Sequence, residues 1–445
     1  MAPAPTVGAG FSPLDAELGL APGQRYTPRV DETLVALSVE TTFGRAVTLL
    51  GRLTGVVASA ATARRRTYAA GEAALVLEAR ELCRIEADPP AVRPTATVMQ
   101  LSADATKVQL VGGEWTDVKP ASLAQVVQKH DQDGQPVVAA VDLTYAVRWE
   151  PAAQFGRTLT LEAQRRNLDG AATVVSPNDG ARWIQDDVVD LVAPQAVRIL
   201  DEAHGAEHLG LIGQLVHGPT GLTAPDWVAR QRTALLDAED GPARVLAELD
   251  RCRAAGPHPA APRTAADPDP AATLAREVTY FHKRADQIRY AAFRRLGYPI
   301  GSGCVESGHG VVIAPRCKRA GMRWAPAHLN PLLVLRGIDA NNRWVEIAPA
   351  IWEELQTGSR QTRRTAQQQR RALRLLQSAP PTAGGPAVVP CLEIPAVATP
   401  ADPPIAPPAA TAAPPRPRPS PHRPRPAANH PWRRPFHHPP QQRAS

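Results

Sequence analysis

Residues 171–218 read AATVVSPNDGARWIQDDVVDLVAPQAVRILDEAHGAEHLGLIGQLVHG, and this stretch decides the fold class. AATVV predicts a short buried strand over 171–175 that ends in the turn-forming residues 176–180. WIQDDVVDLV predicts a helix, VRIL at 197–200 a second strand, and EAHGAEHLGLIGQLVHG a second helix. Because strands followed by helices pack as layers, the stretch predicts an α/β core with a partly parallel sheet.

Two segments before this stretch add further strands. TATVMQLSADATKVQLVGG (95–113) alternates and is rich in β-branched residues, which predicts strands around a turn at Ala103–Thr106. PVVAAVDLTYAVRW (136–149) predicts another strand or pair of strands, and AAQFGRTLTLEAQRRNL (152–168) predicts a helix. The core is therefore expected to begin well before residue 171.

The N-terminal part of the chain has a different pattern. Residues 1–30 are rich in Pro, Gly and Ala and are expected to be loosely structured, whereas 31–90 have the pattern of helices. Gly55 ends one apolar helical repeat, and Ser59 suits the N-cap of a second helix. That outline is typical of a helix-turn-helix, although many helical hairpins share it. Three arginines of the second helix are therefore either DNA contacts or plain solvated side chains: Arg64, Arg65 and Arg66.

The C-terminal part predicts helices and then a tail. Residues 225–295 have a helical pattern broken by a Pro/Ala-rich loop at 256–272. Residues 326–376 are helical in pattern and strongly basic at 360–374. From 378 onward the chain holds 21 of its 47 prolines, so it cannot form a packed core and is expected to be disordered.

Composition limits the partners and the compartment. The net charge of +7 and the pI near 9.4 favour an acidic partner, with nucleic acid first. The five cysteines are scattered without a CxxC pair, which indicates neither a zinc ribbon nor a disulfide framework and fits a reducing cytoplasm. The opening residues lack a basic segment followed by an apolar one, so no signal peptide is expected. No apolar run approaches the length of a membrane span.

A second informative stretch, GYPIGSGCVESGHGVVIAPRCKRAGMRW, occupies residues 297–324. It places Glu306 just after a glycine-rich turn and just before a group of cations. Either the acid pairs with these cations, or it holds a metal while they hold a polyanion. His309 is expected to be structural or to contact DNA. The cations are Arg316, Lys318, Arg319 and Arg323.

Three acids stand where an α/β core presents functional groups. Asp104 follows a predicted strand, Asp179 follows another, and Glu306 begins a predicted helix. Convergent carboxylates repel one another and need bound cations, and oxygen ligands select Mg²⁺ or Mn²⁺. Two such ions can activate a water and stabilise a leaving 3′ oxygen in phosphoryl transfer. Each aspartate taken alone is equally well read as an ordinary turn residue.

The chain resembles the DDE transposases of bacterial insertion sequences, in the ISKra-type branch that is distantly related to Mutator-like elements. The resemblance covers roughly residues 20–345 and is most specific at 297–324, quoted above. DGARWI (179–184) and ILDEAHGAEHL (199–209) come next. Weaker matches are ADATKV with GEWTDVK, EAQRRNL, and LGRLTGVVASAATARRRT. The chain departs from the family pattern at Ala105, at Asn167 and in the Ser-Pro-Asn that precedes Asp179, and these changes bear on activity more than on fold.

This resemblance implies a function and its residues. It implies an RNase H-like core with a helical insertion, in which Asp104, Asp179 and Glu306 are catalytic and hold two Mg²⁺ or Mn²⁺ ions. Asp201 and His204 match a D-x-x-H element that supports the site, and Asp201 is the rival to Asp179 as second metal ligand. The partners implied are terminal inverted repeats and target DNA. A homo-oligomer, a dimer in the synaptic complex, and a cytoplasmic, nucleoid-associated location are also expected, with no membrane partner.

The expected domain organisation follows from these patterns. Residues 31–92 form the helix-turn-helix-like region, and 93–345 form the catalytic core with its helical insertion at about 215–295. A basic helix over 346–377 precedes the tail at 378–445. Trp183 is expected to be a core residue of the helix after Asp179 rather than a base-stacking residue.

Two other functions compete with this interpretation. His204, Glu207 and His208 spell H-x-x-E-H, the motif of inverted zinc metalloproteases, without an evident third ligand. A non-catalytic, transposase-derived DNA-binding protein would need only the basic hairpin and the tail.

Overall fold

The computed structural model describes residues 25–358 except 131, 135, 221–222 and 264–268, and beyond them Glu17, Thr365 and Gln368. The chain divides into two units, 1–378 and 379–445, and every described residue belongs to the first. Most of segment 1–30, nearly all of the basic segment 360–374 and the Pro-rich tail lie outside the described residues. The expectations for those segments stay predictions.

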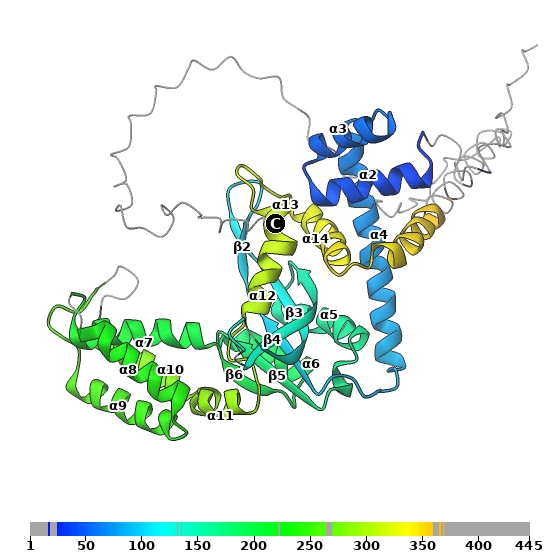
Figure 1. Ribbon diagram of the computed structural model, residues 1–445. Helices are drawn as coiled ribbons and strands as arrows, with labels where there is room; N and C mark the ends of the chain where they lie inside the picture. The colour runs from blue at the N-terminus through cyan, green and yellow to red at the C-terminus, as the bar shows by residue number, and fades with distance from the viewer. Residues whose placement is uncertain are drawn as a thin grey trace, which may run out of the picture. The chain divides into compact units, whose positions relative to one another are not determined.

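A mixed sheet of six strands organises the described fold (Figure 1). The strands are β1 (Val98–Ala103), β2 (Thr106–Gln109), β3 (Trp115–His130), β4 (Pro136–Arg148), β5 (Thr173–Asn178) and β6 (Val197–Leu200). Their order is β2-β3-β1-β5-β6, and β4 pairs with β3. β1 runs antiparallel to β3 and parallel to β5, and β6 runs parallel to β5. The predicted α/β class with a partly parallel sheet is confirmed.

The predicted turn at Ala103–Thr106 is wrong, because the chain does not reverse there. Ala103 pairs with Ala121 and Thr106 with Val118, so β1 and β2 are two parts of one strand along β3. The pairing is interrupted opposite Pro120, which has no N–H to donate to the ladder. The reversal comes in the loop 110–114, where Gly112 and Gly113 take φ values of +111° and +97° that favour glycine.

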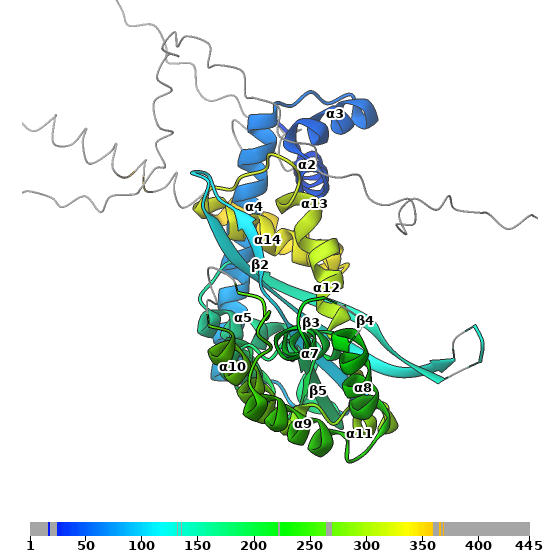
Figure 2. The ribbon, with the colours of Figure 1, turned by 90° about the vertical axis from the view of Figure 1, so that its left-hand side faces the viewer.

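Each face of the sheet is covered by helices. α5 (Ala152–Arg165), the π-helical turn η2 (Ile184–Val189) and α6 (Asp190–Val192) pack on the face that carries Leu101 and Leu123. The opposite face carries Gln100 and Ser122, each of which donates a hydrogen bond of 3.0 Å to Cys304 Sγ. Cys304 belongs to α12 (Gly303–Gly308), which continues through η4 (His309–Ile313) into α13 (Ala314–Cys317). Figure 2 shows the far end of the β3–β4 hairpin standing clear of these helices.

A run of helices lies where the sequence predicts a helical insertion at about 215–295, and it begins at residue 202. It comprises α7 (Glu202–His217), α8 (Thr223–Asp237), α9 (Gly241–Ala255), α10 (Pro270–His282), η3 (Ala285–Gln287) and α11 (Tyr290–Arg295). Its core includes Ile212, Trp227 and Phe281, and this core joins the sheet at Val175 and Ile199. The insertion is therefore packed on the parallel end of the sheet, mostly to the left of the strands in Figure 1.

The N-terminal helices are α2 (Pro28–Glu40), α3 (Phe43–Thr54) and α4 (Ala60–Ala87). Gly55 ends α3 in the left-handed region, and the Ser59 side chain accepts from the Thr62 amide, so both predicted helix ends are confirmed. These helices share a buried core with α14 (Pro326–Ala340) and the helix at 344–358, including Val35, Ala70, Leu335 and Ile351. The expected boundary at 92 therefore separates helices from strands without separating two cores, and the one at 345 falls inside the helix at 344–358.

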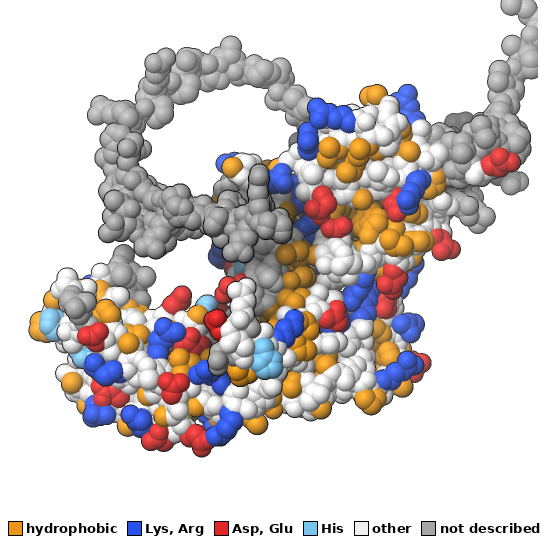
Figure 3. All heavy atoms as spheres, viewed as in Figure 1, with side chains coloured by type: hydrophobic (Ala, Val, Ile, Leu, Met, Phe, Trp, Pro, Cys, Tyr) orange, Lys and Arg blue, Asp and Glu red, His pale blue; other side chains and the backbone are white. Residues whose placement is uncertain are grey.

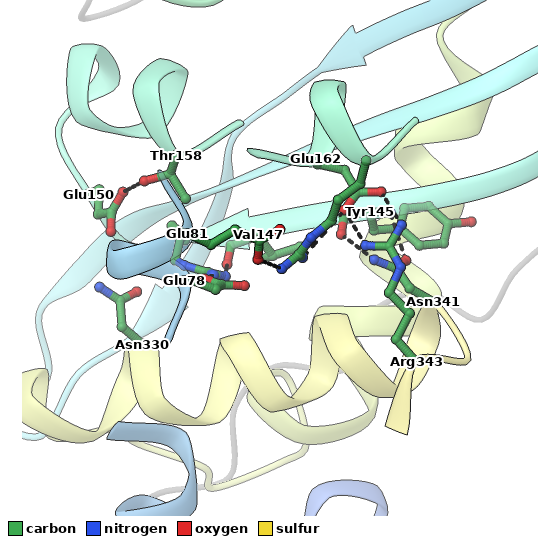
Figure 4. A network of polar contacts seen from close by, with 12 residues as sticks. Glu78, Glu81, Tyr145, Val147, Glu150, Thr158, Glu162, Asn330, Asn341 and Arg343 are labelled. Carbon is green, nitrogen blue, oxygen red and sulfur yellow. Dashed lines mark hydrogen bonds and ion pairs between the residues drawn. The ribbon is translucent and has the colours of Figure 1, made fainter. Parts of the chain in front are cut away.

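Polar contacts add to this junction (Figure 4). Arg148 of β4 pairs with Glu78 of α4, and Arg165 of α5 lies 2.6 Å from Glu81 of α4. Arg343 donates to Glu162 of α5 at 2.8 Å. Two asparagines of the C-terminal helical segment, Asn330 and Asn341, exchange hydrogen bonds with the backbones of Trp149 and Tyr145 respectively. These amides satisfy part of the outer edge of β4, which an unpaired strand would leave open.

Among the described residues, no helix is long and apolar enough to cross a membrane.

Candidate functional site

Three aspartates lie in one row at the carboxyl ends of three neighbouring strands. β1 pairs with β5 at an offset of 75 residues, an offset that the Ser102 Oγ hydrogen bond to the Pro177 carbonyl continues. β5 pairs with β6 so that Asn178 faces Leu200. One residue further along each strand, the same registers align Asp104, Asp179 and Asp201. Adjacent strands lie about 4.8 Å apart, and ligand sites of parallel sheets lie at this end of the strands.

The surroundings of Asp104 disfavour its charged form. Its Oδ1 accepts from the Ala105 amide at 2.7 Å, and His309 Nε2 lies 3.3 Å from Oδ2. Burial raises the pKa of Asp104, and the charge of Asp179 raises it further, while the Ala105 hydrogen bond and the charge of His309 lower it. The pair Asp104–Asp179 is thus close enough for one carboxylate to disfavour ionisation of the other.

Asp179 is held by its backbone as well as its side chain. Its Oδ1 accepts from the Ala181 amide at 2.8 Å, and its carbonyl accepts from the Tyr280 hydroxyl at 2.7 Å. Within the described part of the chain, no hydrogen bond reaches Oδ2. The second oxygen is therefore free to take a cation.

Asp201 differs from Asp104 and Asp179 because the protein occupies both of its carboxylate oxygens. It is 3% exposed, and its Oδ1 accepts from the His204 amide at the first turn of α7. Its Oδ2 accepts from both the amide and the hydroxyl of Ser302, at 2.6 and 2.7 Å. Because both oxygens are engaged by the protein, Asp201 fits the supporting role better than that of a metal ligand. It ties α7 to the glycine-rich turn that precedes Glu306.

Glu306 lies in α12 and is exposed. Burial lowers the pKa of His309, three residues further on, and the charges of Asp104 and, less strongly, of Glu306 oppose this by raising it. His309 in turn contacts Asp104, so the structure links Glu306 to the aspartate row through His309. Among the described residues, no three Asp, Glu, His or Cys side chains form a group that could hold a metal ion. The structure brings Asp104 and Asp179 together and does not bring Glu306 into a metal-binding group with them.

The cations after Glu306 divide into two kinds. Lys318 donates to the Thr106 hydroxyl, two residues from Asp104, and Arg319 and Arg323 are exposed without an ion pair in the described structure. The Trp324 backbone bonds to Gln109 and Val111, which lays this loop along the free edge of β2. The loop 318–323 is therefore a basic surface beside the aspartate row.

Arg316 corrects the prediction that all four cations face DNA. It is 1% exposed, and its guanidinium lies over the rings of Phe43 and Trp324 at 4.9 and 5.3 Å. Its Nε donates to the Ser38 carbonyl at the end of α2. Burial in this aromatic site lowers the pKa of Arg316 and keeps it from a phosphate. Its role in this structure is to join α13 to the N-terminal helices.

The arginines of the helical hairpin also differ from one another. Arg64 and Arg65 are exposed at the start of α4, whereas Arg66 lies 3.4 Å from the buried carboxylate of Asp31. On the face shown in Figure 3, positive and negative side chains are interspersed over the helical insertion. Pairs such as Arg232 with Glu202 account for this mixture. Among the described residues, Arg64 and Arg65 of the hairpin and Arg319 and Arg323 of loop 318–323 are exposed cations without an ion pair, and they could meet a polyanion.

The geometry does not favour a zinc protease at the H-x-x-E-H motif. His208 Nδ1 lies 2.5 Å from Glu277 Oε2, and the imidazole is stacked on the Tyr280 ring at 3.9 Å. His204 lies instead toward the aspartate row, where its charge lowers the pKa of Asp104. The two histidines thus have separate partners.

Trp183 packs against the core beneath α5, with Lys119 Nζ 5.7 Å from its ring. Trp183 is half-buried and packs against this core without being one of its buried residues, so the expectation of a core residue is met in part.

A comparison of the chain with protein-family models and with curated protein sequences finds no match. Sequence reasoning missed Tyr280 and Arg284 as neighbours of Asp179, because they lie about a hundred residues away, at the end of α10 and in the turn after it, with no motif of their own.

Proposed function

We propose that this protein is a DNA transposase of the DDE type, which cuts phosphodiester bonds at element ends and transfers the freed strand into target DNA. The observation that carries the proposal is the alignment of Asp104 and Asp179 at the carboxyl ends of adjacent parallel strands, beside an unpaired basic loop. Three antiparallel strands followed by two parallel ones are compatible with the RNase H-like core that the sequence resemblance implies.

The site suits divalent cations held by oxygen ligands. In the described structure Asp179 Oδ2 accepts no hydrogen bond, and Asp104 Oδ2 faces the His309 imidazole at 3.3 Å. The charge of Asp179 disfavours ionisation of Asp104. His309 Nε2 is buried beside them with no hydrogen-bond partner. Asp104 and Asp179 would hold two Mg²⁺ or Mn²⁺ ions, and Glu306 would have to move toward them to complete the site. Such ions supply activation of a water nucleophile and stabilisation of the leaving oxygen.

The protein's own groups orient the DNA. Lys318, Arg319 and Arg323 would bind backbone phosphates next to the acids, since phosphate contacts fix register rather than sequence. Arg64 and Arg65 of the helical hairpin would contact the inverted repeat. Joining two ends requires two active sites, which implies an oligomer, and a dimer is the simplest one.

A second function is favoured by one observation. Because Glu306 does not complete a metal-binding group, a non-catalytic DNA-binding protein fits the same basic surfaces. A nicking assay separates the two. The substrate is a supercoiled plasmid that carries the DNA flanking the gene, incubated with Mg²⁺ or Mn²⁺.

The transposase proposal requires metal-dependent nicks at the element ends that disappear in Asp104→Asn and Asp179→Asn. Asp186→Asn, at an exposed acid of η2, is the matched control and should nick like the wild type. Wild-type protein that binds the flanking DNA and leaves it uncut with either metal would establish the DNA-binding function instead.

A further inference from the structure

The turn that carries Asp179 is held from outside the sheet, by α10 of the helical insertion and by the turn that follows α10. The Tyr280 hydroxyl of α10 donates to the Asp179 carbonyl at 2.7 Å, and Arg284, just past the end of α10, donates to the Gly180 carbonyl. Two successive carbonyls are thus bound by two side chains four residues apart. Gly180 has a φ of +79°, and a Cβ there would lie 2.4 Å from Arg284 Nε.

The two donors are themselves held in place. The Arg284 guanidinium lies 3.7 Å from the centre of the Tyr280 ring, and its NH1 donates to the Tyr280 carbonyl at 3.0 Å. The His208 ring is also stacked on the Tyr280 ring, and His208 pairs with the buried Glu277. Burial raises the pKa of Tyr280 to about 12, so its hydroxyl remains a donor at neutral pH. The H-x-x-E-H motif thereby contributes a stacking residue.

These contacts restrict the carboxylate of Asp179. With the carbonyls of 179 and 180 bound and Oδ1 held by the Ala181 amide, the backbone of the turn has little freedom to rotate. The Cα–Cβ direction of Asp179 is fixed accordingly. A ligand carboxylate that is fixed before binding loses less conformational freedom when a cation arrives, and groups that orient metal ligands affect affinity strongly.

We propose that Tyr280 and Arg284 form a clamp that positions Asp179 for cation binding, so that the helical insertion takes part in building the metal site. The inference rests on the proposed function, because it takes Asp179 as a metal ligand. Tyr280 and Arg284 are positioning residues, since neither contacts the reacting atoms.

The test uses the full-length chain and two tyrosine variants of the same insertion. Tyr280→Phe removes the hydroxyl and keeps the ring between Arg284 and His208. Tyr290→Phe is the matched control, because Tyr290 is 1% exposed and its hydroxyl has no hydrogen-bond partner in the described structure. Circular dichroism checks that both variants fold.

Two readouts follow, neither of which is activity. Amide hydrogen exchange in the peptide around Ala181 should be faster in Tyr280→Phe and unchanged in Tyr290→Phe. Titration with Mn²⁺ should show about tenfold weaker binding in Tyr280→Phe, in the range found when groups that orient metal ligands are removed. Asp179→Asn gives the reference for loss of the ligand itself.

The outcomes are distinct. Unchanged exchange in Tyr280→Phe overturns the clamp. Faster exchange with wild-type Mn²⁺ affinity shows that the clamp holds the turn and overturns its part in cation binding. Wild-type protein that binds no Mn²⁺ overturns the proposed function and this inference with it, while the exchange data still report on the turn.

Discussion

Substitution of Gly71 by alanine tests the shared core of the N-terminal helices and α14. Gly71 lies inside α4, where helix propensity alone predicts that alanine stabilises by about 1 kcal/mol. In the structure, a Cβ at this position would lie 2.0 Å from the Pro331 carbonyl oxygen and 2.5 Å from its carbon. Ordinary contact would require the helix backbones to separate by more than about 1 Å, and overpacking of this kind costs about 1–3 kcal/mol or more. The cost of overpacking at this contact exceeds the gain in helix propensity from alanine.

Gly71→Ala is therefore expected to destabilise the protein by about 1–2 kcal/mol net, which urea denaturation followed by circular dichroism measures as a lower midpoint. Gly51→Ala is the matched control. Gly51 also lies inside a helix, α3, but its added Cβ would meet only the Val56 carbonyl oxygen at 3.6 Å. That variant is expected to be stabilised by up to about 1 kcal/mol. If Gly71→Ala is as stable as Gly51→Ala, the close approach of α4 and α14 is wrong.

Three further predictions concern buried charges. Arg316→Ala should lower the free energy of unfolding by about 3 kcal/mol, because it removes two ring contacts and leaves a cavity. Arg319→Ala should leave the free energy of unfolding unchanged and weaken DNA binding. The reverse pattern, measured by denaturation and gel-shift assays, contradicts a structural role for Arg316 and a DNA-binding role for Arg319. Burial and the neighbouring Glu40 raise the pKa of Asp339 to about 6. The folded state therefore binds the Asp339 proton more tightly than the unfolded chain does. The stabilisation that this proton contributes is present below about pH 4 and is lost as the pH rises through about 6. Asp339→Asn should therefore raise stability at pH 8 by about 1 kcal/mol after solvent screening, with no gain at pH 4; an equal gain at both values counts against this. Asp201→Asn should lower the denaturation midpoint, because an amide cannot accept all three hydrogen bonds from α7 and from Ser302 in the turn before α12. The expected cost is about 1–3 kcal/mol, and an unchanged midpoint would indicate that these bonds do not form.

Local patterns predicted much of the fold. VRIL predicted β6 with its bounds, and Gly55 and Ser59 predicted the ends of α3 and α4, because caps depend on neighbouring residues alone. The long strand β3 was missed, since Pro120 and the polar residues near its end obscure the alternation. This segment forms a strand because it pairs with β1 and β4, and no local sequence pattern indicates that pairing.

The candidate site shows the same division. Positions just after strands indicated Asp104 and Asp179, and the registers place them side by side. Arg316 had the sequence surroundings of a DNA contact, and only the approach of Phe43, 273 residues earlier in the chain, explains its burial. Likewise the contact of Tyr280 with Asp179 exists only once the insertion packs on the sheet. Long-range packing of this kind has no signature in a single sequence.

The junction of α4 with α14 also affects how the chain folds as it is synthesised. Pro326, where α14 begins, leaves the ribosome about 240 residues after Ala87, where α4 ends. At about 5–20 residues per second, translation takes about 10–50 s to cover that distance. During this time Val35, Ala70 and Ala74 have no partner from α14 and present apolar surface. The N-terminal helices are thus synthesised first, but their shared core is completed only when α14 is available. A nascent chain truncated before α14 should therefore bind chaperones that the full-length chain no longer needs.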